Sequence, residues 1–161
     1  MTPVQTQVRP HLRRLLAGVR LDSSRDSIDT RAIEGIDPEM AFGKAVIRGT
    51  EPGLTVILPS DTFDAENFEG VAMNHFLSEL NLDGSLSIDE GSAIGVLNWG
   101  RTVVYLAPGI TPQYGDSIYV IPSGDNRGKF TNQETGNIEV QGRFLREQEG
   151  ELRAVELFRR G

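Results

Sequence analysis

The sequence contains no cysteine among its 161 residues. A chain without cysteine has no disulfide bond and offers no thiolate to a structural metal. Histidine is scarce as well, because only His11 and His75 occur and they lie far apart in the sequence. A zinc site therefore lacks ligands, and we predict that the protein uses no metal ion and no other cofactor.

Residue patterns that perform catalysis are also missing. Several serines occur, but none stands in a G-x-S-x-G sequence, and no Ser–His–carboxylate set can be assembled. The acidic stretch 61–66 departs from the order of an EF-hand loop, because Phe63 occupies the place of the second oxygen ligand and no glycine holds the sixth place. The sequence thus predicts a protein that is not an enzyme.

The chain has no long apolar run. No stretch approaches the roughly 20 apolar residues that a membrane-spanning helix requires, and the start lacks the apolar centre of a signal peptide. The net charge of −7 disfavours sequence-independent binding to nucleic acid. We therefore expect a protein made in the cytosol, with neither a membrane nor nucleic acid as a direct partner.

Charge of one sign is missing from two regions. Residues 1–20 carry Arg9, Arg13, Arg14 and Arg20 without any acid, whereas residues 51–100 carry nine acidic residues and no basic one. Such a bipolar chain can attract another copy of itself or a partner that is bipolar too. The alternative is that these charges simply lie on solvated loops.

What the chain does contain is a series of short apolar runs bounded by Gly, Pro, Asn and Asp. Runs of this length that are rich in Val, Ile, Leu and Tyr are typical of strands. They predict an all-β fold, a small β-barrel or sandwich of short antiparallel strands. The predicted strands are 42–48, 54–58, 68–73, 93–97, 101–106, 117–121 and 128–131, with 138–146 and 151–158 as a closing hairpin; 75–82 fits a strand or a helical turn.

Trp99 stands between two of these runs. The sequence Asn98-Trp99-Gly100 predicts a hairpin turn, in which Gly100 takes a positive φ. A bulky aromatic residue in a turn often anchors an interface. Trp99 is therefore a candidate for contact with a partner, the alternative being that it folds back over the end of the barrel.

At the beginning of the chain the apolar residues are spaced as in a helix and not as in a strand. Leu12, Leu15, Leu16 and Val19 share one face of a predicted short helix, and Arg13, Arg14 and Arg20 fall mostly off that face. A helix of two to three turns is marginal alone in water, so its apolar stripe must dock on its own barrel or on a neighbouring subunit. These seven residues, with Trp99, form the predicted partner interface.

Residues 22–38 are polar and lack a clear period, and we interpret them as an extended connector between the helix and the sheet. The chain is thus predicted to divide into an N-terminal arm, residues 1–40, and a β-barrel domain, residues 41–161. If the arm only attaches the protein to a partner, deleting residues 1–21 leaves a folded barrel.

One loop suggests another function. Gly124-Asp125-Asn126-Arg127-Gly128 resembles a dUTPase loop, although the other motifs of that family are missing. A small nucleotide-hydrolysing or nucleotide-binding β-barrel is therefore the alternative to a structural protein.

Most of the chain resembles a different family, the small cement (decoration) proteins of tailed-bacteriophage capsids. The resemblance begins near Leu16 and rests on patterns of turns and strands. The residues that carry it are Leu16–Gly18, Asp29–Ala32, Phe42–Val46, Gly49-Thr50, Phe68–Ala72, Asp89–Gly91, Gly100–Val104, Gly115–Val120 and Lys129-Phe130.

The resemblance implies a structural role in the virion. A protein of this family is expected on the outer surface of the assembled head, where it bridges neighbouring major capsid proteins and resists the pressure of packaged DNA. Its expected partners are the major capsid protein and copies of itself, as a homotrimer. A tail or baseplate adaptor is an alternative that differs in where the copies sit.

Overall fold

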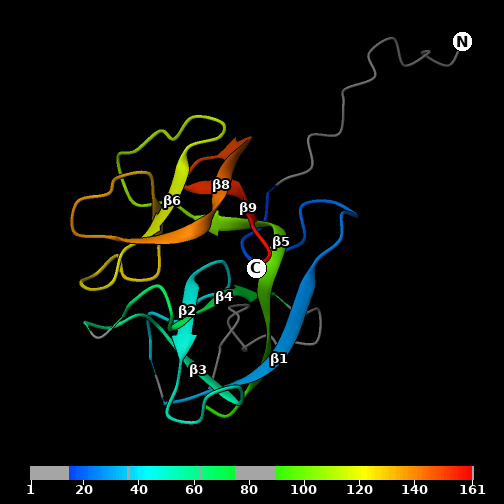
Figure 1. Cartoon of the computed structure of the whole chain (residues 1–161), viewed down its shortest axis with the longest axis vertical. Coiled ribbons are helices and arrows are strands. Elements are labelled where there is room, and N and C mark those ends of the chain that lie inside the picture. Colours follow the sequence, from blue (N-terminus) through cyan, green and yellow to red (C-terminus); the bar gives the residue numbers. More distant parts are fainter. Residues whose placement is uncertain (1–14, 36, 62, 75–89, 161) are drawn as a thin grey trace, which may run out of the picture.

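The computed structural model describes residues 15–35, 37–61, 63–74 and 90–160. These residues form nine β-strands and no α-helix, and none of their segments is a helix that could span a bilayer. The predicted all-β fold is therefore confirmed (Figure 1). The strands are β1 (Ser27–Ile33), β2 (Ala45–Arg48), β3 (Thr55–Ile57), β4 (Phe68–Met73), β5 (Ala93–Tyr105), β6 (Ser117–Val120), β7 (Phe130–Thr131), β8 (Ile138–Glu149) and β9 (Leu152–Leu157).

The first five strands close into a small barrel. Their order is β1-β3-β2-β4-β5, and β5 pairs back onto β1, so that each strand has a neighbour on both sides. All these pairings are antiparallel except β1–β3, which is parallel and corrects the expectation of antiparallel strands alone. Closure removes the unpaired strand edges that an open sheet would expose.

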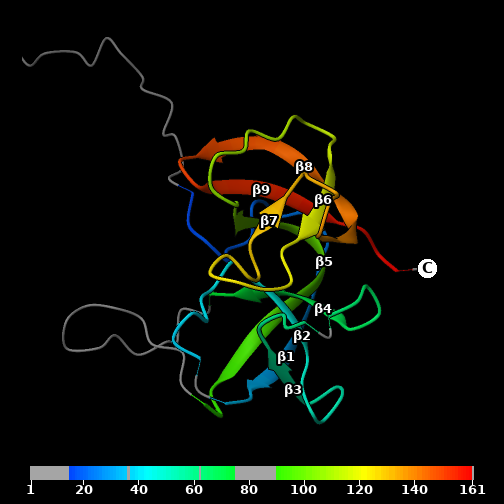
Figure 2. The same cartoon turned by 90° about the vertical axis from the view of Figure 1, so that its left-hand side faces the viewer.

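The last strands form a second sheet in the order β5-β9-β8-β6-β7. It lies beyond one end of the first barrel, and β5 runs from one half into the other (Figures 1 and 2). A parallel bridge joins Phe130 of β7, the last strand in this order, to Leu106 just after the end of β5. The closing hairpin is confirmed as the antiparallel pair β8–β9.

β5 is continuous through Trp99, so the predicted hairpin turn is wrong. The first part of β5 pairs with β1 and β4, with Ser27 opposite Trp99, and the part from Gly100 onward pairs with β9. Gly100 does take a positive φ of 127°, and a Cβ there would lie 2.5 Å from the Cβ of Asp26. The glycine thus lets the chain pass closely where β5 changes sheets, instead of reversing its direction.

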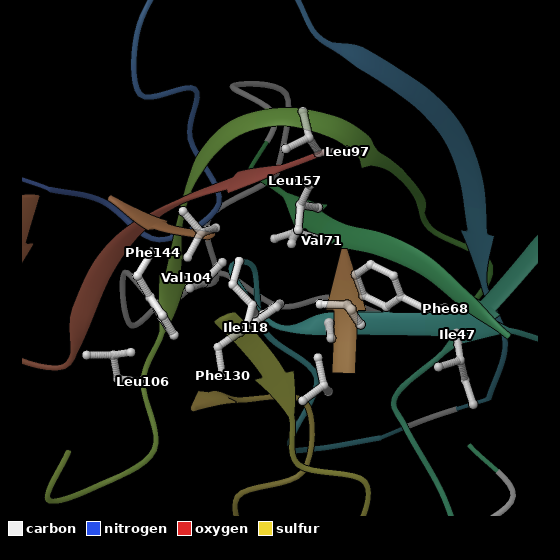
Figure 3. Packing of buried hydrophobic residues seen from close by; sticks show 14 of the residues in the cluster. Ile47, Phe68, Val71, Leu97, Val104, Leu106, Ile118, Phe130, Phe144 and Leu157 are labelled. Carbon is white, nitrogen blue, oxygen red and sulfur yellow. The ribbon is translucent and has the colours of Figure 1, made fainter. Parts of the chain in front are cut away.

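Two apolar clusters fill the molecule. Alternate residues of β2 and β4 point in opposite directions, as strand geometry requires. Val46 and Ala72 belong to a cluster with Val56 and Val96, whereas Ala45 and Val71 join a larger cluster with the second sheet. The larger cluster includes Leu97, Val104, Leu106, Ile118, Phe130, Phe144 and Leu157, and packs the two halves together (Figure 3).

The N-terminal part of the chain differs from its prediction in two ways. Residues 15–20 are not helical, so the predicted helix is not supported, and its first turn lies outside the described residues. Residues 22–38 are no free connector, because they contain β1, which pairs with β5 over six residue pairs. Both corrections have one cause, since strand partners far along the chain satisfy the backbone groups that a marginal helix or a solvated linker would leave to water. Residues 75–82 also lie outside the described part.

Candidate partner-binding surface

The segment 15–22 is bonded onto β5. The Gly18 and Leu21 amides donate to the carbonyls of Val103 and Arg101, at 2.9 and 3.2 Å, and the Thr102 hydroxyl donates to the Val19 carbonyl at 2.8 Å. Gly18 has a φ of 71°, and a Cβ there would lie 2.7 Å from the Ala72 carbonyl oxygen. These contacts make the segment part of the fold and not a free arm, while folding of the chain without residues 1–21 stays a prediction.

The predicted interface residues separate into three groups. Leu12, Arg13 and Arg14 lie outside the described residues. Leu15, Val19 and Arg20 line a groove on the second sheet, and Leu16 beside them leaves 54% of its surface exposed. Trp99 is half-buried within β5 and does not line this groove. The structure therefore brings together three of the eight residues, and whether any of them contacts a partner stays a prediction.

The groove has a volume of about 900 Å³ and lies between residues 15–22 and the outer faces of β5 and β8. Val103 and Leu145 give it an apolar floor, and Tyr114 stands at its wall with 61% of its surface exposed. Sequence patterns did not single out Tyr114 or the β8 residues. Their only signal is that the apolar–polar alternation of β8 ends in four consecutive charged or polar residues, 146–149.

Paired charges close one side of the groove. Arg143 binds Glu156 at 2.9 Å and lies under the Tyr114 ring, with 5.4 Å between the guanidinium carbon and the ring centre. Arg101 binds Asp22 at 3.1 Å, and this hydrogen bond raises the pKa of the arginine above its usual value. These pairs neutralise most of the positive charge of this wall.

A buried arginine shapes the other side of the groove. Arg153 of β9 is 6% exposed, and burial lowers the pKa of its guanidinium. Its Nε donates to the Leu145 carbonyl at 2.6 Å and its Nη1 to the Gln148 amide oxygen at 2.7 Å. β8 bulges between these two contacts. Phe144 pairs with Val155 and Gln148 pairs with Arg153, so β8 has more residues than β9 over the same stretch. Arg153 thus holds β8 in the bulged path that forms the groove wall.

The dUTPase-like loop has a different role in the structure. Arg127 binds Asp37 at 2.5 Å and Glu39 at 2.9 Å, so its charge is paired within the protein. The small hollow beside it, of about 310 Å³, is lined by Glu39 and Asp61 as well, and this acidic lining disfavours a phosphate. The described residues also contain no group of three or more His, Cys, Asp or Glu side chains that could hold a metal ion.

Similarity to known proteins extends over almost the whole chain. The family model of the phage structural cement proteins (E217 gp24/Pam3 gp6) matches residues 4–157. The chain belongs to this family. The resemblance predicted from turns and strands is thereby confirmed, and no curated protein sequence matches the chain.

A solved structure extends the comparison to the fold of this cement protein. The chain is similar to one described as the capsid of Myoviridae Phage XM1, with a TM-score of 0.73 and 17% sequence identity. The match covers 98% of each chain, so the two halves joined by β5 recur together. At this identity the likeness concerns the fold alone.

Proposed function

We propose that this cement protein binds the outer surface of an assembled phage head, bridges neighbouring major capsid proteins and stabilises the shell against the pressure of packaged DNA. The family match over residues 4–157 carries the proposal. The role needs contact surfaces and no chemistry. In agreement with it, most of the arginines that line the groove, and Arg127 of the dUTPase-like loop, are engaged by carboxylates of the same chain.

The proposed contact includes Leu12, Arg13, Arg14, Leu15, Leu16, Val19 and Arg20, with Trp99 as a separate contact. Leu16 supports this choice, because an exposed leucine beside a groove loses unfavourable contact with water when a partner covers it. Each contact of this size is weak, but many copies on a symmetric lattice that each bind at more than one point attach strongly. We propose trimers as the bound form.

The test is to add purified protein to heads that lack it and to image them. Density on the outer surface between capsid subunits is expected, and decorated heads should release DNA at a higher temperature than bare ones. Density confined to the tail or the baseplate would contradict the proposal, and isolated monomers would contradict the trimer.

Matched variants locate the attachment. Replacing Arg13 and Arg14 by alanine should lower occupancy on heads at low salt and have a smaller effect at high salt, because salt already screens these charges in the unaltered protein. Arg25→Ala with Arg159→Ala removes the same charge at two exposed positions elsewhere and should leave occupancy unchanged. Equal loss in both variants would show that net charge matters and not the N-terminal arginines. Hydrolysis of dUTP that is lost in Asp125→Ala would contradict the structural role altogether.

A further inference from the structure

We propose that the groove binds residues 4–9 of a second copy of this chain, which add as a strand to the open edge of β8. The inference deepens the proposed contact between copies and rests on it. It names both surfaces of that contact, the end of β8 in one copy and the start of the chain in the other.

The open edge is the part of β8, residues 145–149, that extends beyond the end of its pairing with β6. β6 pairs with β8 only as far as Arg143, and the last bonds on this side join Phe144 to Gly115 and Asp116. From residue 145 to residue 149, the only strand that pairs with β8 in the described structure is β9. A strand edge of this kind can accept another chain through backbone hydrogen bonds.

The start of the chain has the pattern of such a strand. Residues 4–9 read Val-Gln-Thr-Gln-Val-Arg, so that β-branched side chains alternate with long polar ones. Pro3 and Pro10 flank this stretch, and every residue between them has an amide that can donate. Six residues extend over about 20 Å, which is enough to span the five residues of the open edge. Val4, Thr6 and Val8 would face the groove floor beside Val103 and Leu145.

Charges on the two surfaces are complementary. Residues 1–14 carry Arg9, Arg13 and Arg14 and no acid, whereas the β8–β9 tip carries Glu147 and Glu151, both exposed. Most of the arginines that line the groove are neutralised within their own chain: Arg20 pairs with Asp26, Arg101 with Asp22 and Arg143 with Glu156. An arginine-rich strand is therefore attracted to the tip more than it is repelled by the groove wall.

The position of Leu15 favours a second copy over the same chain. The Leu15 amide donates to the Glu149 carboxylate at 2.9 Å, so the described chain enters at the far end of the open edge. For residues 4–9 to return along β8 of their own chain, residues 10–14 would have to reverse direction. That sequence, Pro-His-Leu-Arg-Arg, contains Pro10 but no glycine, asparagine or aspartate, the residues that take the positive φ of many tight turns, and its two adjacent arginines repel each other. The same strand reaches a neighbouring copy without a reversal.

Cysteine cross-linking tests the proposal directly, because the natural chain has no cysteine. Thr6→Cys and Arg146→Cys are made in separate full-length proteins, mixed and oxidised. Arg146 is chosen because it lines the groove and is exposed. The control partner is Glu134→Cys, an exposed position in the turn before β8. We expect about tenfold more disulfide-linked dimer from the first mixture, since bound strands raise the effective concentration of the two thiols.

Two outcomes would overturn the proposal. One is equal cross-linking in the two mixtures. The other is a Thr6→Cys/Arg146→Cys double variant that closes within one chain at high dilution while the mixture gives no dimer, which would assign the groove to the chain's own N-terminus. The cross-link is read without heads, so its failure leaves attachment to the capsid, as proposed above, untouched.

A charge variant provides a second, independent test. Glu147→Lys in the Arg146→Cys protein should lower the yield of cross-linked dimer about fivefold at low salt and much less at high salt. Glu139→Lys changes the same residue type on the same strand, away from the groove, and should have no effect. Equal losses in both variants would contradict the charge complementarity on which the proposal depends.

Discussion

In the first half of the molecule every strand from β1 to β5 has a neighbour on each side, whereas in the second half β8 continues beyond β6 and, among the described residues, the only strand that pairs with it there is β9. The closed half pairs each of its strands on both sides and encloses the smaller apolar cluster, in which Phe42 and Met40 accompany aliphatic side chains. The second half shares the larger cluster, but its outer face carries the groove, a buried arginine and an acidic tip.

This difference indicates a division of labour. A closed barrel has few unpaired strand edges to offer a partner. The open edge and groove of the second half keep hydrogen-bonding groups and charges available, while the shared core fixes their positions. The four predictions below test that division, from the largest expected effect to the smallest.

The shared core should contribute most to stability. Phe144 of β8 is fully buried in the larger cluster, and Phe144→Ala is expected to lower the free energy of unfolding by about 4 kcal/mol. Phe158→Ala, just after β9, serves as the control, because that side chain is 44% exposed and should cost far less. Chemical denaturation measures both variants. A small effect at Phe144 would show that the second half does not depend on the shared core.

Closure of the first barrel should depend on Gly70. Its φ is 151°, and a Cβ there would lie 2.0 Å from the Leu97 carbonyl oxygen of β5, which cannot move without breaking the β4–β5 pairing. Gly70→Ala should therefore lower the free energy of unfolding by about 3 kcal/mol. Gly91→Ala also replaces a glycine with positive φ, but it meets no atom within 4 Å and should cost about 1 kcal/mol. Similar losses would argue against a tight closure at Gly70.

Two truncations should separate the bonded segment from the residues before it. Removing residues 1–21 takes away the four hydrogen bonds that Gly18, Val19 and Leu21 make, besides the contacts of Leu15 with Glu149 and of Arg20 with Asp26. At about 0.5–1.5 kcal/mol each, the loss should be at least about 2 kcal/mol. Removing only residues 1–14 should change thermal stability little and yet reduce occupancy on heads. If both truncations melt alike, the segment 15–21 contributes nothing to the fold.

The smallest expected effect is on the pH dependence of stability. It concerns Asp116, which lies where the pairing of β8 with β6 ends. Asp116 accepts hydrogen bonds from the Gln113 amide and from the Asn132 side chain, which lower the pKa of its carboxyl below 3.8. Because the folded-state pKa is the lower one, the stabilisation is present above the ordinary aspartate range and is lost as the pH falls through the lowered value. Asp116→Asn should therefore flatten the acid side of the stability profile. An unchanged profile would show that other carboxylates dominate there.

Local patterns were sufficient for the elements whose partners are near in the sequence. The strand at 68–73 was predicted with its observed bounds, and the hairpin of β8 and β9 follows from apolar alternation on either side of a short polar turn. The resemblance to the cement proteins rested on the same turns and strands. For the interface, the sequence indicated the segment that contains Leu15, Val19 and Arg20, but it had no signal for Tyr114 or Leu145, which line the groove from strands far along the chain.

The sequence by itself determined the all-β class, the lack of cysteine and of a complete catalytic motif, and the family, because these depend on composition and on neighbours within a few residues. Tertiary structure decided the rest. Residues Ser27–Ile33 form a barrel strand because six of them pair with β5. Residues 15–20 are not helical because their backbone groups form hydrogen bonds with β5 instead. Gly100 likewise lies where β5 crosses from one sheet to the other and not in a turn, because β9 pairs with β5 from Gly100 onward. Backbone groups take the partners that the whole fold brings to them, and local periodicity does not contain that information.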